Sequence, residues 1–279
     1  MVKKDQHTTP RCYLKNFSDD GKSIFRKFKR VDQSNEMRNK ELNKPISLRS
    51  AAVIEDFYTV QDVNNPMVVE TTVYANHIEN EYTNIYSLLV YPNANQLDME
   101  QRRKLLAFFL SLHSRTPKQF DLFLKNVPEQ FNFELDKIKE DYKVAHVKEI
   151  LPALLEAHEF KIVKVARLTD SSEFITSDNP VLIVGGDNNL KNNEYQQQFM
   201  VNNTIIIPID KKHCCIFFEG KDKNGIDLRN KVFYNKIIRK DVDVSFASTV
   251  NMLMLESAQK YYFGSEKYIK TFFHLFKLV

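Results

Sequence analysis

The spacing of apolar residues changes near the middle of the chain, and this change constrains the fold more than any other sequence feature. Up to His158, apolar side chains recur at three- and four-residue steps, which places them on one face of a helix. After His158 they alternate or run in short blocks, as they do in strands. Helices followed by strands, without regular alternation, predict an α+β domain with a mostly antiparallel sheet rather than a doubly wound nucleotide fold.

The first half of the chain is predicted to be largely helical. From Val68 to Val90, a row of apolar residues marks the buried face of one helix. Asp98 and Gln101 have the spacing of a capping box, so the next helix should begin there and end before Pro117. Helical patterns also cover residues 10–17, 120–124 and 129–158. We expect these helices to pack on a sheet from the second half.

The second half is predicted to supply that sheet and a closing helix. Short apolar segments predict strands around Ile175 and at residues 160–165, 181–184, 205–209 and 214–218. A helix should run from about Asp241 to Tyr262 and stop at Gly264, because glycine commonly terminates helices. Residues 1–279 are expected to form a single α+β unit, and lobes at 1–158 and 159–279 are the alternative division.

Composition argues against several classes of protein. Six glycines and no tryptophan in 279 residues argue against propellers and small sandwiches, which are built from many tight turns. The sequence contains neither a glycine-rich phosphate loop nor a Gly-x-Ser-x-Gly nucleophile turn. No window reaches about 18 consecutive apolar residues, and the opening Met-Val-Lys-Lys-Asp is followed by polar residues. We therefore expect no membrane partner and no secretion signal.

Cysteine usage indicates a reducing compartment. The chain has three cysteines, an odd number, and two of them, Cys214 and Cys215, are neighbours that would bridge only through a strained ring. We expect these two and Cys12 to be ordinary buried thiols. The cytoplasm is the location that fits this pattern.

Charge is distributed unevenly, although the net charge is only +4. Residues 1–49 hold thirteen Lys or Arg and six Asp or Glu, whereas residues 50–100 hold eight acids and no Lys or Arg. One interpretation is that the two segments neutralise each other and that the basic run at 26–30 is solvated. The other is that Arg26, Lys27 and Arg30 contact phosphates while the interleaved phenylalanines stack on a base or ring.

Several short motifs occur in a defined order along the chain. The opening has the form His-x-x-Pro-x-x-Tyr-Leu-x-x-Phe, from His7 to Phe17. Further motifs are Asp56-Phe57-Tyr58, Glu70, Ile78-Glu79, Arg115-Thr116-Pro117 and Phe174-Ile175-Thr176-Ser177-Asp178-Asn179-Pro180, followed by Pro208 and Asn251. Together they resemble the bacterial domain-of-unknown-function family numbered 4238 over nearly the whole chain. The resemblance implies recurring polar positions at the His, the helical Glu, the Arg and the Ser-Asp pair, a pattern typical of an enzyme site, but it implies no reaction.

Three of these positions are candidate catalytic groups, each with a structural alternative. The imidazole of His7 exchanges protons near pH 7 or binds a metal, unless it only bonds backbone at the start of a helix. The Arg115 guanidinium suits an oxyanion or phosphate, unless it serves the dipole at the end of its helix. Asp178 follows a strand, where carboxylates often reach a cleft, unless it forms an Asx turn before Pro180.

The helix after Val68 carries the remaining candidates. In a regular α-helix Glu70, His77 and Glu81 share one face, which suits a metal or an acid/base pair but also a solvated stripe. Glu79, the position indicated by the resemblance, would then project nearly opposite Glu70. The two carboxylates would face a single site only if the helix departed from regular geometry.

These candidates lead to two functional hypotheses. The first is a hydrolase acting on a phosphate-bearing substrate, a nucleic acid or nucleotide, in which His7, Glu70, Glu79 and Asp178 are acid/base or metal groups and Arg115 stabilises developing charge. Substrate contacts are expected from the basic run and from motif residues: Arg11, Ser177 and Asn179. A divalent metal such as Mg²⁺ is the cofactor that this chemistry would use. The alternative is a non-catalytic module that binds nucleic acid or a partner protein.

Overall fold

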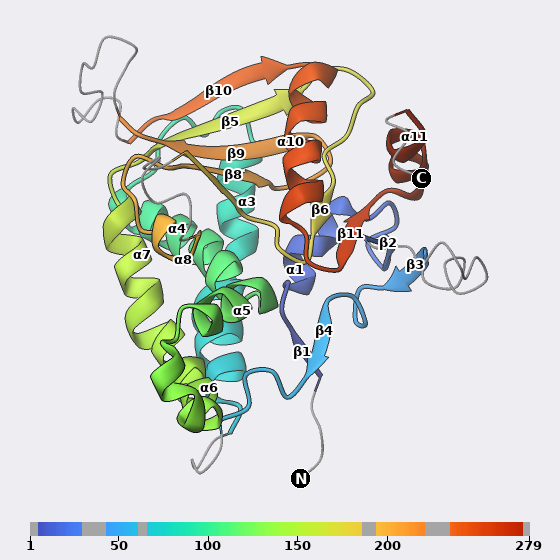
Figure 1. Cartoon of the computed structure of the whole chain (residues 1–279). Coiled ribbons are helices and arrows are strands. Elements are labelled where there is room, and N and C mark those ends of the chain that lie inside the picture. Colours follow the sequence, from blue (N-terminus) through green and yellow to red (C-terminus); the bar gives the residue numbers. More distant parts are fainter. Residues whose placement is uncertain (1–4, 30–42, 61–65, 186–193, 221–234, 276–279) are drawn as a thin grey trace.

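The fold combines a helical layer with two main sheets, as the α+β pattern predicts (Figure 1). The computed structural model describes residues 5–29, 43–60, 66–185, 194–220 and 235–275. Helices from the first half lie beneath a five-stranded sheet from the second half. No helix in these ranges is long and apolar enough to cross a membrane.

The helical layer consists of consecutive short segments rather than a few long helices. A single run from Val69 to Val90 changes winding twice, from π to 3₁₀ to α. The opening segment contributes two further short pieces, α1 and η1, between the first two strands. The segments are α1 (Arg11–Leu14), η1 (Lys15–Phe17), η2 (Val69–Ile78), η3 (Glu79–Glu81), α3 (Tyr82–Val90), α4 (Met99–Ser114), α5 (Pro117–Lys125), η4 (Glu129–Glu134), α6 (Leu135–Ala145), η5 (His146–Ile150) and α7 (Leu151–His158).

The larger sheet comes entirely from the second half of the chain. Its order is β10-β5-β9-β8-β7, and all neighbours are antiparallel except β10 and β5. The predicted strands are present, but β10, which pairs in parallel beside β5, was not predicted. The strands are β5 (Ile162–Leu168), β7 (Leu182–Val184), β8 (Thr204–Pro208), β9 (His213–Phe218) and β10 (Ile237–Val242).

A second sheet joins the two ends of the chain. Its order is β3-β2-β11-β6, and a separate pair, β1 and β4, lies beside it. The first residues of the basic run, 26–28, lie in β2. The bounds are β1 (Asp5–His7), β2 (Ser23–Phe28), β3 (Lys44–Ser47), β4 (Val53–Glu55), β6 (Thr176–Ser177) and β11 (Tyr261–Gly264).

The end of the chain differs from the prediction of one helix up to Tyr262. The helix is α10 (Val244–Ser257), and the residues after it form β11, which is followed by α11 (Glu266–Leu275). Aromatic residues at 261–263 favour a strand once partners exist on both sides, and β2 and β6 supply them. Gly264 ends this strand, where an added Cβ would lie 3.3 Å from Ile269 Cδ1.

The helical layer contacts the large sheet through stacked aromatic rings. Tyr82 of α3 stacks on Phe108 of α4 with ring centroids 4.2 Å apart. Phe109 meets Phe217 of β9 edge to face at 6.0 Å. Aromatic pairs of this kind add about 0.5–1.5 kcal/mol to the burial of their surface. The contacts hold α4 in place near residues 108 and 109.

The N-terminus of α4 has the predicted capping box. The Asp98 carboxylate accepts a hydrogen bond from the Gln101 backbone N–H at 2.8 Å, and the Gln101 side chain accepts one from the Asp98 N–H at 3.0 Å. We predict that Asp98→Ala lowers the free energy of unfolding by about 1 kcal/mol, because the Gln101 backbone N–H loses its partner. Asp98→Asn, which keeps the cap acceptor, should lose less. Urea denaturation of both variants checks this, and equal losses would contradict it.

Candidate functional site

A buried arginine lies at the C-terminal end of α4 and binds two other segments of the chain. The Arg115 side chain is 0% exposed. Its Nη1 pairs with Glu79 Oε1 at 2.8 Å, Nη2 donates to the His7 carbonyl at 2.9 Å, and Nε donates to the Thr8 carbonyl at 3.2 Å. The guanidinium thus joins the end of β1 to the helix run that follows β4.

One planar face of the Arg115 guanidinium packs against an aromatic ring. The Arg115 Cζ lies 4.5 Å from the centroid of the Tyr74 ring, a cation–π contact. Tyr58 donates a hydrogen bond to the Arg115 carbonyl, and Tyr74 bonds the ring of His146. Burial opposes the charge of Arg115, but Glu79 and the other acidic groups nearby outweigh it and raise the Arg115 pKa. The arginine is therefore a permanent buried cation.

The π-helix η2 brings two carboxylates to this cation. Bonds from residue i to i+5 widen each turn by nearly one residue, so the nine steps from Glu70 to Glu79 make about two turns instead of two and a half. The opposite orientation expected for a regular α-helix does not apply. Both carboxylates act electrostatically on Arg115, and Glu70 also senses the charge of Glu79.

The two carboxylates differ in their surroundings. Glu79 is ion-paired with Arg115 and its side chain is 22% exposed. Burial raises the pKa of Glu70, while the Arg115 charge and a hydrogen bond from the His7 backbone N–H oppose that shift. Glu70 Oε2 is buried and has no hydrogen-bond partner among the described residues. Burial thus shifts Glu70 toward its protonated form, whereas Glu79 is paired with a cation.

His7 lies at the end of β1, and its ring is held in one orientation. The ring Nε2 is 3.1 Å from the Arg49 carbonyl oxygen, which accepts a hydrogen only if Nε2 carries it. Burial lowers the pKa of His7, and the charges of Glu79, Arg11 and Arg115 act on it as well. The neutral ring therefore presents Nδ1 as a proton acceptor. Arg11, one of the expected substrate contacts, is exposed.

Hydrogen bonds connect the motifs that carry the family resemblance. Gln6 donates to the Thr59 hydroxyl at 3.1 Å and accepts from the Tyr58 backbone. Thr116 donates to Asn179 Oδ1 at 3.1 Å. Tyr13 donates to the Pro208 carbonyl at 2.7 Å. Direct hydrogen bonds therefore join motifs that are up to 195 residues apart in sequence.

Asp178 is bound by backbone amides at and just before the start of β11. Its two oxygens accept hydrogen bonds from the N–H groups of residues 259, 260 and 261 at 2.9, 2.7 and 3.2 Å. Burial raises the Asp178 pKa, and these donors oppose the shift. The neighbouring Ser177 hydroxyl points to Met254 Sδ at 3.1 Å, and Asn179 Nδ2 donates to Ser257 Oγ at 2.6 Å. Ser177 and Asn179 thus contact α10, and Asp178 binds the backbone that leads into β11.

The basic run of β2 packs against aromatic rings of the protein itself. Arg26 lies over the rings of Phe28 and Tyr261 at 5.4 and 5.0 Å, and Lys27 lies over Phe273 at 4.5 Å. Phe25 is buried in the core. Arg30 lies outside the described residues. The rings that were expected to stack on a base are therefore occupied by cations of the same chain.

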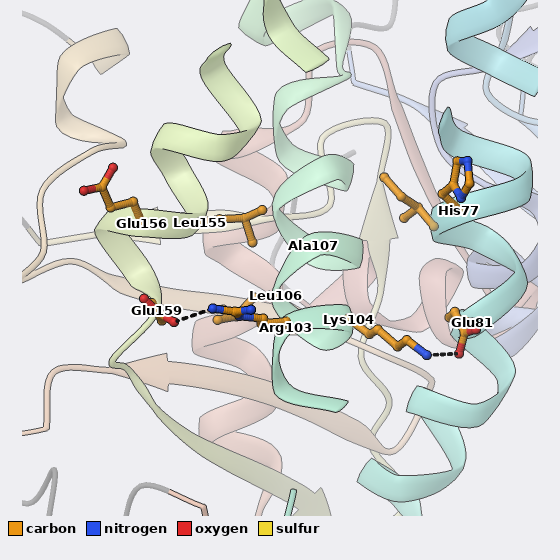
Figure 2. A pocket seen from close by; sticks show the side chains of 10 residues that line it. His77, Glu81, Arg103, Lys104, Leu106, Ala107, Leu155, Glu156 and Glu159 are labelled. Carbon is orange, nitrogen blue, oxygen red and sulfur yellow. Dashed lines mark ion pairs between the residues drawn. The ribbon is translucent and has the colours of Figure 1, made fainter. Parts of the chain in front are cut away.

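Two glutamates of the acidic stretch pair with cations in α4 or directly after it. Beside the Arg115 pair, Glu81 bonds Lys104 at 3.3 Å (Figure 2). His77 and Glu81 line a pocket of about 330 Å³ with Arg103 and Glu159 at its rim, so the predicted row with Glu70 is not kept. Within the described ranges, no three His, Cys, Asp or Glu side chains are grouped as a metal site requires.

Some residues of the site were not predicted from the sequence. Tyr58, Tyr74 and His146 form the aromatic support of Arg115, and their spacing matched ordinary core positions. One signal was available at Asp56, which has φ of 54°. Aspartate tolerates this left-handed conformation better than most residues, so its place in the Asp-Phe-Tyr motif indicated a sharp turn.

Comparison with known proteins agrees with the sequence motifs. No curated protein and no solved structure gave a significant match to this chain. The sequence profile of one family, described as protein of unknown function (DUF4238), matches residues 5–268 and so includes every motif residue around Arg115. The chain belongs to the DUF4238 family.

Proposed function

We propose that this protein is a hydrolase acting on a phosphate-bearing substrate, with His7 as general base and Glu70 as general acid. The observation that carries the proposal is that His7, whose ring is bonded through Nε2, donates its backbone N–H to Glu70, a buried carboxyl whose Oε2 has no partner among the described residues. Two titratable groups whose environments drive them to opposite proton roles are typical of acid/base catalysis. Their convergence on one buried cation supports a common site.

Each group has a defined role in the proposed reaction. His7 Nδ1 takes a proton from water, whose oxygen forms the new bond to phosphorus. Glu70 gives its proton to the oxygen of the breaking bond, so the leaving group departs neutral. Arg11, exposed near His7, supplies the cation for the phosphate, and Arg115 acts as a positioning residue because its donors are bound by protein groups.

We propose the cytoplasm as the location and a nucleotide or nucleic acid as the substrate. Cys12, Cys214 and Cys215 are all free thiols, which suits a reducing compartment. Burial raises the pKa of Cys12 to about 12, so its thiol is not the nucleophile. An exposed arginine beside acid/base groups suits the charged phosphate of a nucleotide. A divalent metal is the cofactor that we expect to assist the hydrolysis.

The direct test is a substrate screen with matched variants. Purified protein is incubated with labelled RNA, DNA and nucleotides, with and without Mg²⁺ or Mn²⁺, and released products are resolved. His7→Ala should lower the rate by about 10²–10⁴-fold. His274→Ala, which removes an exposed histidine of α11, should not change it. Binding without turnover in every arm would favour the non-catalytic alternative.

Activity should depend on pH through His7 and Glu70. The base must be neutral and the acid protonated, so kcat/KM should rise through the lowered pKa of His7 and fall through the raised pKa of Glu70. We expect a bell-shaped profile with its maximum on the acidic side of neutrality. A profile measured from pH 4 to 9 checks this. A rate that rises steadily to pH 9 would contradict these roles.

Glu70→Gln separates catalysis from stability. The amide cannot give up a proton as the acid does, so turnover should fall at least about tenfold. The same change removes a carboxyl that is costly to bury, so the midpoint of thermal unfolding should stay the same or rise. Asp178→Asn should show the reverse, a lower midpoint with turnover retained, because its oxygens serve backbone amides. Calorimetry measures the unfolding midpoint of each variant, and rate assays measure its turnover.

A further inference from the structure

A pocket lined by aromatic side chains lies between the Asp56-Phe57-Tyr58 turn and helices α5 and α6. This aromatic pocket has a volume of about 230 Å³. An engineered apolar cavity of about 150 Å³ in another protein is large enough to hold benzene. The pocket therefore has room for one aromatic ring with a small substituent. The rings that line it are Phe57, Tyr58, Phe120, Tyr142 and His146.

The position of Phe57 is not explained by the site around Arg115. Within its motif, Asp56 forms the turn, with φ of 54°, and Tyr58 is buried and bonds the Arg115 carbonyl. Phe57 is only half-buried, and so is Phe120, which it meets edge to face. These two rings therefore supply the accessible aromatic surface of the pocket, as ligand pockets commonly require.

The three buried rings offer carbon surface rather than polar atoms. Tyr58 and Tyr142 donate their hydroxyl hydrogens to carbonyls at the end of α4. His146 Nδ1 donates to the Tyr142 carbonyl at 3.1 Å, and its Nε2 accepts from the Tyr74 hydroxyl. Burial lowers the His146 pKa to about 4, so this ring is neutral. A ligand thus finds all polar ring atoms of the pocket already bonded.

The charged residues of the lining are of both signs and form ion pairs. Lys143 Nζ lies 2.5 Å from Glu140 Oε1, and Lys139 Nζ lies 3.2 Å from Asp136 Oδ1. Two lysines and two acids line the pocket, so its formal charge is zero: Lys139, Lys143, Asp56 and Glu140. An ionic ligand would therefore meet repulsive as well as attractive groups, whereas an uncharged ligand meets neither.

Neighbouring rings of the lining meet at steep angles. Phe57 lies edge to face with Tyr58 at 4.7 Å and with Phe120 at 5.9 Å, and Phe120 is tilted against Tyr142 at 5.0 Å. Aromatic rings favour such arrangements because the positive edge of one ring meets the negative face of the next. A further ring in the pocket can extend this network, which a saturated ring of the same size cannot do.

We propose that the aromatic pocket binds a small, uncharged aromatic molecule, whose ring packs against Phe57 and Phe120. The volume of the pocket sets the size of the molecule, the aromatic lining favours an aromatic ring over a saturated one, and the balanced charges disfavour ions. The pocket contains neither His7 nor Glu70, so this inference does not depend on the proposed hydrolysis.

The test compares four forms of one small molecule by ligand-observed NMR titration of the full chain at neutral pH. Benzyl alcohol is the uncharged aromatic form, cyclohexylmethanol is its saturated counterpart, and benzoate and benzylammonium carry a charge of either sign. We expect benzyl alcohol to bind about two- to tenfold more tightly than cyclohexylmethanol, because only the aromatic ring gains edge-to-face contacts. Both ions should bind more weakly than benzyl alcohol. Equal affinity of the two alcohols, tighter binding of either ion, or no binding of benzyl alcohol overturns the proposal.

Substitutions at the two half-buried rings locate the site. Phe57→Leu and Phe120→Leu each remove one ring but keep an apolar side chain, so benzyl alcohol should bind about two- to tenfold more weakly. Phe131→Leu, at an exposed phenylalanine of η4, should leave the affinity unchanged. The thermal midpoint of each free variant shows whether it is folded. Full affinity in both pocket variants, or an equal loss in Phe131→Leu, overturns the assignment.

Discussion

The burial of one guanidinium is the constraint on which the rest of the structure depends. Taking a charge out of water costs several kcal/mol, and this cost is offset only when good partners surround it. Arg115 obtains them from Glu79, from the carbonyls of His7 and Thr8 and from the Tyr74 ring. The N-terminal strand, the π-helix and the end of α4 must therefore come together at one point.

The π-helical winding of residues 69–78 determines which side chains lie beside Arg115. An α-helix over residues 69–78 would place a single carboxylate beside the arginine, whereas the π-helix places two. One of them is paired and the other keeps an unsatisfied oxygen. π-helical turns are uncommon and are frequent at functional sites, so this winding and the left-handed Asp56 indicate strain that the packed surroundings maintain.

The hydrogen-bond state of polar groups separates structural residues from functional candidates. Asp178 has three backbone donors, and Arg115 has acceptors for each of its nitrogens. Glu70 keeps a buried oxygen without a partner in the described ranges. Because desolvating such an atom is costly, it is more informative about function than charge alone.

The sequence by itself determined the α+β class, the capping box at Asp98 and the family, because these depend on local periodicity and on short motifs. It also named His7, Glu70, Glu79, Arg115 and Asp178 as candidate catalytic positions. Only the tertiary structure decided that residues 261–264 form a strand, that β10 pairs in parallel, and that the carboxylate of Asp178 serves the backbone. The physical reason is that each of these depends on partners distant in sequence, as does the width of η2, which holds both glutamates beside a buried cation.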